Sequence, residues 1–173
     1  MTLRRSQCVK ESLVRGNGER SQTMIFRILS VSSIVVIIDR LTKYLLSGNL
    51  SEGESVGVVP GFFHITLVLN SGAAFGLFKS RSAFFAISSA LVIVFICLYM
   101  WRGRCRDLLI LTALGLILGG AVGNLIDRVA FGYVIDFLDF RIWPVFNIAD
   151  ASITVGASIL AAKLILDKRC CTT

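Results

Sequence analysis

Four apolar runs limit the fold of this chain more than any other feature, because each is long enough to cross a lipid bilayer. A spanning helix needs about 20 mostly apolar residues. Of the 173 residues, 55% are hydrophobic and only 17% are charged, which is not typical of a soluble domain. The sequence therefore predicts transmembrane helices over residues 25–46, 83–101, 108–126 and 148–166.

The basic residues predict the orientation of these helices. They gather before the first run, between the second and third runs, and after the fourth run, which by the positive-inside rule places both termini in the cytoplasm. Lys79 and Arg81 lie on the other side and weaken the contrast without reversing it. The net charge of +7 is then a signal of topology. It does not predict a nucleic-acid partner, because the basic residues do not alternate with aromatic residues along any stretch.

The remaining segments complete an all-α membrane protein with four transmembrane helices and a small extracytoplasmic β-sheet and loop region. Residues 24–169 form the membrane domain, with outward segments at 47–82 and 127–147. Residues 58–70 are rich in β-branched and aromatic residues and predict one or two strands that lie on the bilayer. Residues 1–23 are polar and basic and are expected to be a disordered cytoplasmic extension, and residues 170–173 a cytoplasmic tail.

Small residues form a stripe on the third run. Gly115, Gly119 and Gly123 recur every four residues, and Ala157 and Ala161 form a weaker stripe on the fourth run. Such spacing lets another helix backbone approach closely, so we interpret both stripes as packing surfaces. No internal repeat is evident, which argues against a transporter built by duplication.

The aspartates are the feature that a membrane protein has most difficulty accommodating. Each costs roughly 2.5–3.5 kcal/mol in the middle of a bilayer unless it is paired, hydrated or functional. Five of the seven lie at the ends of the apolar runs or in the loop between two of them: Asp39, Asp127, Asp136, Asp139 and Asp150. Several carboxylates at one depth indicate a polar site cut into the membrane protein.

Two of the motifs around these acids have a simple structural interpretation. Asp39 and Lys43 lie four apart on one helix face, with the acid first, and predict an ion pair that closes the end of the first span. Asn124, Asp127 and Arg128 share a helix face at the outer end of the third span. That face suits either an anchor of charges or the lining of a polar cavity.

Three other positions are less easily explained by packing. Asn70 opens the glycine-containing loop NSGAAFG, where the backbone must turn tightly or approach a partner closely. Asn147 lies where a helix N-cap belongs, and Asp150, three residues later, is placed either as its capping-box partner or as a reactive group. Asp136 lies between Ile135 and Phe137, a setting in which a carboxyl group resists ionisation.

Elimination leaves little chemistry other than that of carboxylates. His64 is the single histidine and lies in the strand-like segment. The sequence therefore gives little support for a histidine-based catalytic triad or a zinc site with several histidines. Phosphate-binding loops and dinucleotide fingerprints are absent from the sequence. A pair of aspartates that shares one proton can activate water and protonate a leaving amine. In such a pair Asp150, at a helix N-terminus, favours the charged form and Asp136 the protonated form, although the two titrate as a unit.

Five motifs occur in order along residues 25–166: DRLTKY, NSGAAFG, GGAVGNLIDR, VIDF and FNIAD. In this series the chain resembles lipoprotein signal peptidase, the aspartic membrane peptidase family of bacteria. The resemblance implies catalysis by Asp136 and Asp150. It implies a substrate site lined by Asn70, Asn124, Arg128 and Asn147, and a mainly architectural role for Asp39, Lys43 and Asp127.

The resemblance also implies the reaction and its setting. The substrate is a prolipoprotein with a diacylglyceryl-modified cysteine, cleaved just before that cysteine without a metal or organic cofactor, and the antibiotic globomycin blocks the site. The enzyme is expected as a monomer in the bacterial inner membrane, surrounded by membrane lipid, with its active site near the outer face.

Two other functions compete with this interpretation. A small four-helix proton-coupled exporter would also carry membrane carboxylates, but near the middle of a span, whereas the middle of every predicted span here lacks Asp and Glu. A non-catalytic scaffold protein would not need Asp136 and Asp150 together.

Overall fold

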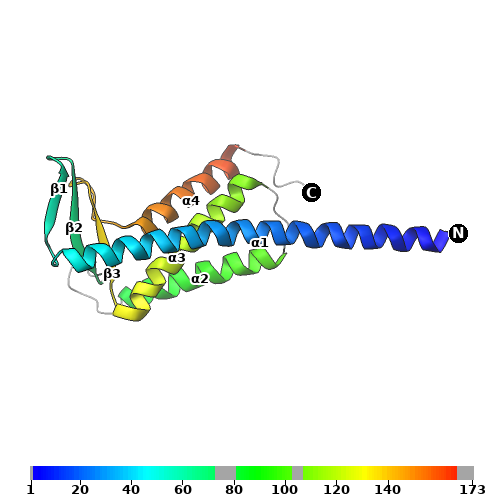
Figure 1. Ribbon diagram of the computed structural model, residues 1–173, viewed down its shortest axis with the longest axis horizontal. Helices are drawn as coiled ribbons and strands as arrows, with labels where there is room; N and C mark the ends of the chain where they lie inside the picture. Colours follow the sequence, from blue (N-terminus) through cyan, green and yellow to red (C-terminus); the bar gives the residue numbers. More distant parts are fainter. Residues whose placement is uncertain (1, 73–80, 103–106, 167–173) are drawn as a thin grey trace.

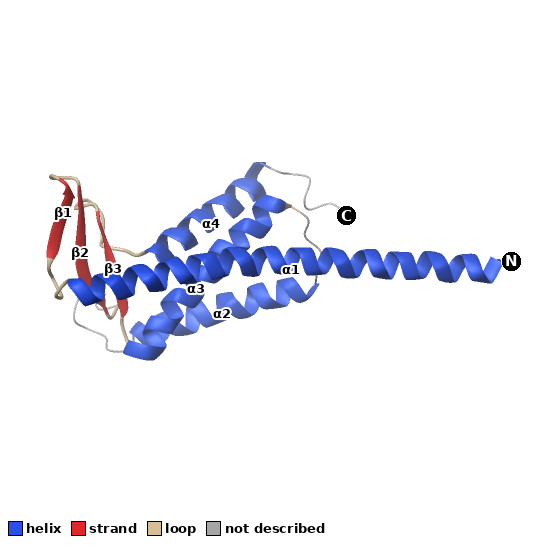
Figure 2. Ribbon diagram, in the orientation of Figure 1, coloured by secondary structure: helices blue, strands red, loops and turns tan. Residues whose placement is uncertain are grey.

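The described part of the chain forms four helices and a small sheet; Figures 1 and 2 show their arrangement. The computed structural model describes residues 2–72, 81–102 and 107–166, so the expected tail at 170–173 lies outside the described residues. The helices are α1 (Thr2–Asn49), α2 (Arg81–Arg102), α3 (Leu108–Phe131) and α4 (Ile148–Leu166). The strands are β1 (Ser55–Val59), β2 (Phe63–Asn70) and β3 (Val134–Asp139). The sheet lies at one end of the helices, and the N-terminal part of α1 projects beyond their other end (Figure 1).

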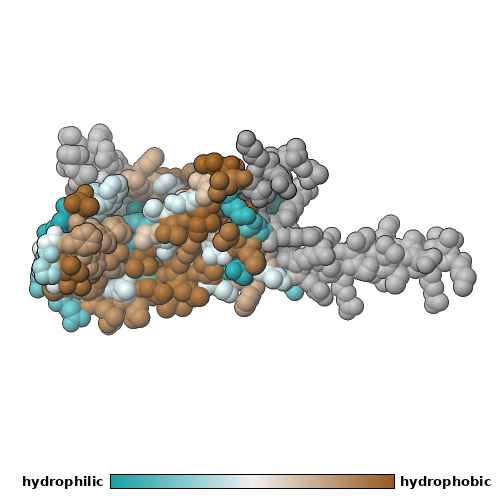
Figure 3. Space-filling model, turned by 90° about the horizontal axis from the view of Figure 1, so that it is seen from above, coloured by the Kyte–Doolittle hydropathy of each residue, from teal (hydrophilic) through white to brown (hydrophobic). Residues whose placement is uncertain are grey.

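Within the described residues, three helices are long and apolar enough to cross a membrane: Ser82–Arg102, Leu108–Phe131 and Ile148–Leu166. The fourth predicted span, on α1, is not among them, and its apolar part ends at Asp39, Arg40 and Lys43. Apolar side chains cover much of the helices in Figure 3. A surface of this kind suits lipid, so the chain is a multi-pass membrane protein.

Two boundaries differ from those expected. Residues 2–23 belong to α1, where a disordered extension was expected. No proline occurs before Pro60, and a helix that has begun gains one hydrogen bond with each residue added. Helix α3 continues to Phe131, so the outward segment that was expected from residue 127 begins inside a helix. Gly132, at φ 81°, ends α3 in the left-handed conformation, and its N–H donates to the carbonyl of Arg128.

Helix α3 is the centre of the bundle and contacts the other three helices. A Cβ atom built on Gly115 or Gly119 would lie 2.7 Å from the Cβ atom of Val31 or Val35 on α1, closer than real side chains approach. The predicted glycine stripe is therefore confirmed as a packing surface. Helix α4 approaches α3 through Gly156, where a Cβ would lie 2.7 Å from the carbonyl of Ala113.

The sheet is antiparallel, in the order β1-β2-β3. The expectation of one or two strands in residues 58–70 is confirmed by β2, which lies inside that range. β1 begins before the range, at Ser55, and β3 was not expected. The register pairs Val68 with Asp136 and Asn70 with Val134, so the end of β2 lies beside the carboxylate of β3. A bridge between Leu138 and Phe146 then brings the chain back to the sheet just before α4 begins.

Candidate active site

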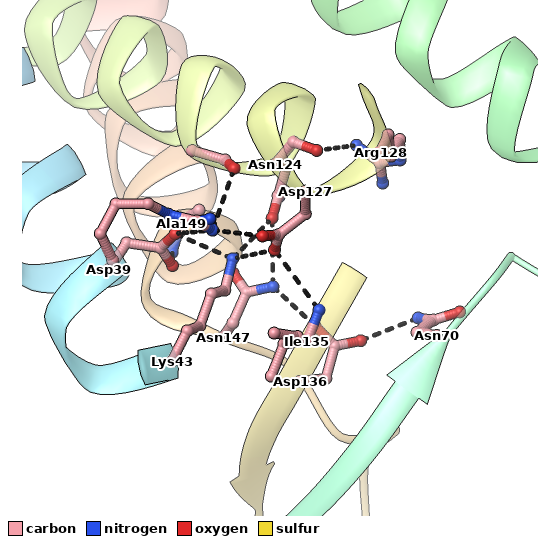
Figure 4. A network of polar contacts seen from close by, with 12 residues as sticks. Asp39, Lys43, Asn70, Asn124, Asp127, Arg128, Ile135, Asp136, Asn147 and Ala149 are labelled. Carbon is pink, nitrogen blue, oxygen red and sulfur yellow. Dashed lines mark hydrogen bonds and ion pairs between the residues drawn. The ribbon is translucent and has the colours of Figure 1, made fainter. Parts of the chain in front are cut away.

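Four charged side chains form a group between α1 and α3, which we call the ion cluster: Asp39, Arg40, Lys43 and Asp127. Figure 4 labels Asp39, Lys43 and Asp127, which are buried, whereas Arg40 is partly exposed. Lys43 Nζ lies 2.8 Å from Asp39 Oδ2 and 2.7 Å from Asp127 Oδ2. Arg40 Nη2 pairs with Asp127 Oδ1 and lies 3.2 Å from Asp39 Oδ2. The predicted Asp39–Lys43 pair is confirmed. With both carboxylates 0% exposed, two cations and two anions balance, as buried charges require.

Arg40 is the residue of this cluster that sequence reasoning missed. The sequence did hold a signal, because Asp39 and Asp127 are two acids and Lys43 supplies only one positive charge. A second cation was therefore needed, and Arg40 adjoins the first acid. Its Nη2 also donates to the carbonyl of Gly123 at 3.3 Å.

The ion cluster also holds the two segments that carry the other acids. Asp39 Oδ1 accepts the N–H of Ala149, in the first turn of α4, at 3.1 Å. Asp127 Oδ2 accepts the N–H of Ile135, on β3, at 3.4 Å. The cluster thus fixes the backbone next to Asp150 and next to Asp136.

Asp136 is buried on β3, with 1% of its surface exposed. Its Oδ1 accepts from Asn147 Nδ2 at 2.6 Å, and its Oδ2 accepts from Asn70 Nδ2 at 2.8 Å. Burial raises the pKa of Asp136 from 3.8 to about 6, with the nearby negative charge of Asp150 adding to the effect and the two amide donors opposing it. The expected preference for the protonated form is confirmed in direction.

Asp150 is half-buried in the first turn of α4, and its Oδ1 accepts from Asn124 Nδ2 at 2.6 Å. The predicted cap is confirmed, because the N–H of Asp150 donates to Asn147 Oδ1 at 2.9 Å. Asn147 Nδ2 also donates to Asn124 Oδ1 at 3.1 Å. Two asparagines therefore connect the carboxylates of Asp136 and Asp150, and we call this group the amide-bridged carboxylates.

A groove of about 330 Å³ opens beside Asp150, between α2, α3 and α4. Three of its lining residues, Asn124, Arg128 and Asp150, bring polar groups to the groove. Most of the others are apolar, and the whole lining comprises Phe85, Ser88, Ser89, Val92, Ile117, Ala121, Asn124, Arg128, Asp150 and Ile153. The guanidinium of Arg128 lies 5.4 Å above the ring of Phe85, and its Nη1 makes two long contacts, at 3.5 Å, to Ser89 Oγ and Asn124 O.

Asp139 is not part of this site, although it is three residues from Asp136. Its carboxylate accepts from Thr66 Oγ1 at 2.7 Å and from the N–H of Arg141 at 2.8 Å, and these bonds lower its pKa. Residues three apart on a strand face opposite sides.

The other predicted positions lie as follows. The structure brings Asn70, Asn124 and Asn147 onto the carboxylates and places Arg128 in the groove. The part of the NSGAAFG motif after Gly72 lies outside the described residues. In the part of the chain that the structure describes, no three His, Cys, Asp or Glu side chains gather as a metal site would require.

Comparison with known proteins places this geometry in a family. The family model for signal peptidase (SPase) II matches residues 31–166. The chain is 46% identical over 131 residues to the lipoprotein signal peptidase of Halothermothrix orenii, which covers 76% of this chain and 90% of the relative. It is 48% identical over 139 residues to the lipoprotein signal peptidase of Moorella thermoacetica, which covers 80% and 92%.

The fold agrees with that assignment. A bacterial membrane enzyme solved by the in meso method at 1.9 Å resolution is similar with a TM-score of 0.75 and 34% identity, over 82% of this chain and 94% of that one. The family model, over residues 31–166, includes the ion cluster and the amide-bridged carboxylates. The chain belongs to the signal peptidase II family and is a membrane peptidase.

Proposed function

We propose that this protein is an aspartic endopeptidase that removes the signal peptide from diacylglyceryl-modified prolipoproteins, cutting just before the lipidated cysteine. The observation that carries the proposal is the pair of acids, Asp136 and Asp150, connected by two amides beside a groove in the bundle. The names of the curated relatives support the same reaction.

The proposed chemistry needs one proton on the pair. Asp150, at the N-terminus of α4, acts as the base and takes a proton from water, whose oxygen attacks the scissile carbonyl carbon. Asp136, with its pKa raised to about 6, carries the shared proton and donates to the carbonyl oxygen. The carbon–nitrogen bond then breaks as the proton on Asp150 passes to the departing amine, and a hydroxyl of the tetrahedral intermediate returns its proton to Asp136. The products are the signal peptide, with a new carboxylate, and a lipidated cysteine with a free amino group.

The residues around the pair have separable roles in this proposal. Asn124 and Asn147 already bind the carboxylates, so they hold the two acids in position. Arg128 makes long contacts and lies in the groove, where its guanidinium would bind a carbonyl of the substrate peptide. The apolar residues of the lining suit apolar parts of the substrate.

The proposal includes α1 as the fourth span. Apolar side chains of α1 face outward between charged ends, with Ile34 57% exposed and Ile37 63% exposed, as lipid contact requires. Both termini would then lie in the cytoplasm, because the basic residues gather there, and the sheet and the carboxylates would lie at the outer face of the bacterial inner membrane. We propose that the protein works as a monomer, surrounded by lipid.

Placement of the acids favours a peptidase over a proton-coupled exporter. The amide-bridged carboxylates lie at the end of the bundle that carries the sheet, next to β3 and the first turn of α4. A scissile peptide just outside the lipid would meet them at that depth. An exporter would need a carboxylate near the middle of a span.

Incubation of the purified protein with a synthetic diacylated prolipopeptide tests the proposal. The same peptide with an unmodified cysteine is the matched control, and the masses of the released fragments give the cleaved bond. We expect cleavage just before the lipidated cysteine, none of the unmodified peptide, and inhibition by globomycin. Intact diacylated peptide after prolonged incubation with folded protein would contradict the proposal.

A further inference from the structure

Lys43 has a third contact beyond its two carboxylate partners. Its Nζ lies 3.3 Å from Asn124 Oδ1, and Lys43 is 1% exposed. An ammonium group has three donors and no acceptor. The amide of Asn124 must therefore turn its oxygen toward Lys43, and its nitrogen then faces Asp150, 2.6 Å away.

The second asparagine receives the same orientation. Asn147 turns its oxygen toward the N–H of Asp150, which can only donate, so its nitrogen faces Asp136 and the oxygen of Asn124. Asn124 Oδ1 thus accepts from both Lys43 and Asn147. Reversal of either amide would place donor against donor, so the two orientations support each other.

We propose that Lys43 is a positioning residue of the peptidase reaction, whose ammonium orients the amide of Asn124 and thereby holds Asp150 and Asp136 in the arrangement that activates water. This inference rests on the proposed function. It adds to the structural role of the ion cluster, because Asn124 lies outside that cluster, contacts Asp150 directly and reaches Asp136 through Asn147.

The charges around Lys43 make its role specific. The groups that face it or share its partners are Asp39 and Arg40 on α1, Asp127 and Arg128 on α3, Asp136 on β3 and Asp150 on α4. Arg40 also pairs with both acids of the ion cluster. Lys43 is the member of the cluster whose contact with Asn124 connects it to the carboxylates. Its charge also lowers the pKa of Asp136, against the effect of burial.

A charge-balanced double substitution separates positioning from stability. Lys43→Met together with Asp39→Asn removes one positive and one negative charge and leaves Arg40 with Asp127. The matched control is Lys163→Met together with Asp107→Asn, which removes a lysine–aspartate pair at the cytoplasmic end of α3 and α4. Folded fraction is measured by size-exclusion chromatography and thermal unfolding in detergent, and kcat and KM with the diacylated peptide.

We expect kcat of the Lys43→Met/Asp39→Asn protein to fall about tenfold to hundredfold per folded molecule, with KM within about threefold. The alkaline limb of its kcat/KM profile should move to higher pH, because that limb reports loss of the proton from Asp136 and the positive charge that favours ionised Asp136 is gone. The control should stay within about twofold of the wild type in kcat.

A mutant cycle with Asn124→Ala tests whether Lys43 acts through that amide. In the Asn124→Ala background, the Lys43→Met/Asp39→Asn substitution should lower kcat further by less than about threefold. The Lys43→Gln/Asp39→Asn protein keeps a donor for Asn124 and should recover activity relative to the methionine variant; if the methionine variant fails to fold, the glutamine variant carries the cycle.

The inference would be overturned if Lys43→Met/Asp39→Asn lowered kcat as much in the Asn124→Ala background as in the wild type. It would also be overturned if that double substitution left kcat and the pH profile unchanged. Wild-type enzyme is assayed beside every variant. If the wild type does not cut the peptide, the proposed function fails, whereas an active wild type with multiplying losses contradicts only the role of Lys43.

Discussion

The ion cluster and the amide-bridged carboxylates are two buried polar groups at the same end of the bundle, built on different principles. In the ion cluster, Asp39 and Asp127 each contact both Arg40 and Lys43. Asp136 and Asp150 instead accept hydrogen bonds from neutral amides. The ion cluster contains equal numbers of positive and negative groups, whereas the hydrogen-bond donors to the amide-bridged carboxylates carry no positive charge.

That difference separates acids that hold the fold from acids that are available for chemistry. Asp39 and Asp127 each lie between two cations, and these ion pairs connect α1 to α3. Asp136, buried with amide partners, has a pKa raised to about 6 and can exchange a proton in the physiological range. The first group fixes the backbone at Ala149 and Ile135, and the second uses that fixed frame.

Removal of an acid from the ion cluster should have the largest effect on stability. Asp127→Ala leaves Arg40 and Lys43 with one carboxylate between them, and we expect unfolding to become easier by about 3–5 kcal/mol. Thermal unfolding in detergent measures the change. Asp107→Asn, which weakens a partly exposed ion pair and keeps an N-cap side chain for α3, is the control and should cost clearly less. Equal losses from the two substitutions would contradict the assigned role of the cluster.

Asp136→Asn should stabilise the protein relative to the wild type, unlike Asp127→Ala, and only above acidic pH. Because burial raises the pKa of Asp136 from 3.8 to about 6, the native state resists its ionisation, and the wild type loses stability as pH rises through that window. The gap corresponds to about 3 kcal/mol at most. The melting temperature of Asp136→Asn relative to wild type should therefore increase between pH 4 and pH 8. A difference that stays constant or decreases over that range would show that Asp136 ionises without cost.

Asp139→Asn should change activity little. Its carboxylate is bonded to Thr66 and Arg141, away from Asn124 and Asn147, so we expect kcat within about threefold of the wild type. The diacylated peptide assay measures it. A loss as large as that expected for an acid of the reactive pair would show that the pair has been assigned to the wrong residues.

Deletion of residues 1–23 should have the smallest effect. Among the side chains that the structure describes, the buried core includes Met24 and Ile28 on α1, and we expect the bundle to form without residues 1–23. We expect specific activity and melting temperature equal to those of the full chain within error. A large fall in specific activity would assign a functional role to the N-terminal part of α1.

The contrast between the two groups could be predicted from sequence only in part. Apolar length predicted the four helices, and spacing predicted the Asp39–Lys43 pair and the cap at Asn147. These are local features, in which the partners lie within one or two helical turns. The ion pair of Arg40 with Asp127 was not predicted, because the two residues are 87 residues apart along the chain.

Strand β3 and the amide bridge depend on tertiary structure. Residues 134–139 are buried or nearly so on both faces, so they lack the alternation of apolar and polar residues that indicates a strand. Asn70, Asn124 and Asn147 were identified as site residues through the family resemblance. Which carboxylate each would bind follows from the register of β2 against β3 and the packing of α3 on α4, which spacing along the chain does not contain.

Turnover by the purified Asp136→Asn and Asp150→Asn proteins is the most direct test, because each substitution keeps the amide-bridged site nearly unchanged in shape while removing one acid. At equal concentrations of folded protein, we predict that each cuts the diacylated peptide at least about a thousandfold more slowly than the wild type. Cleavage by either variant at a rate near that of the wild type would contradict the assignment of that aspartate to the reaction.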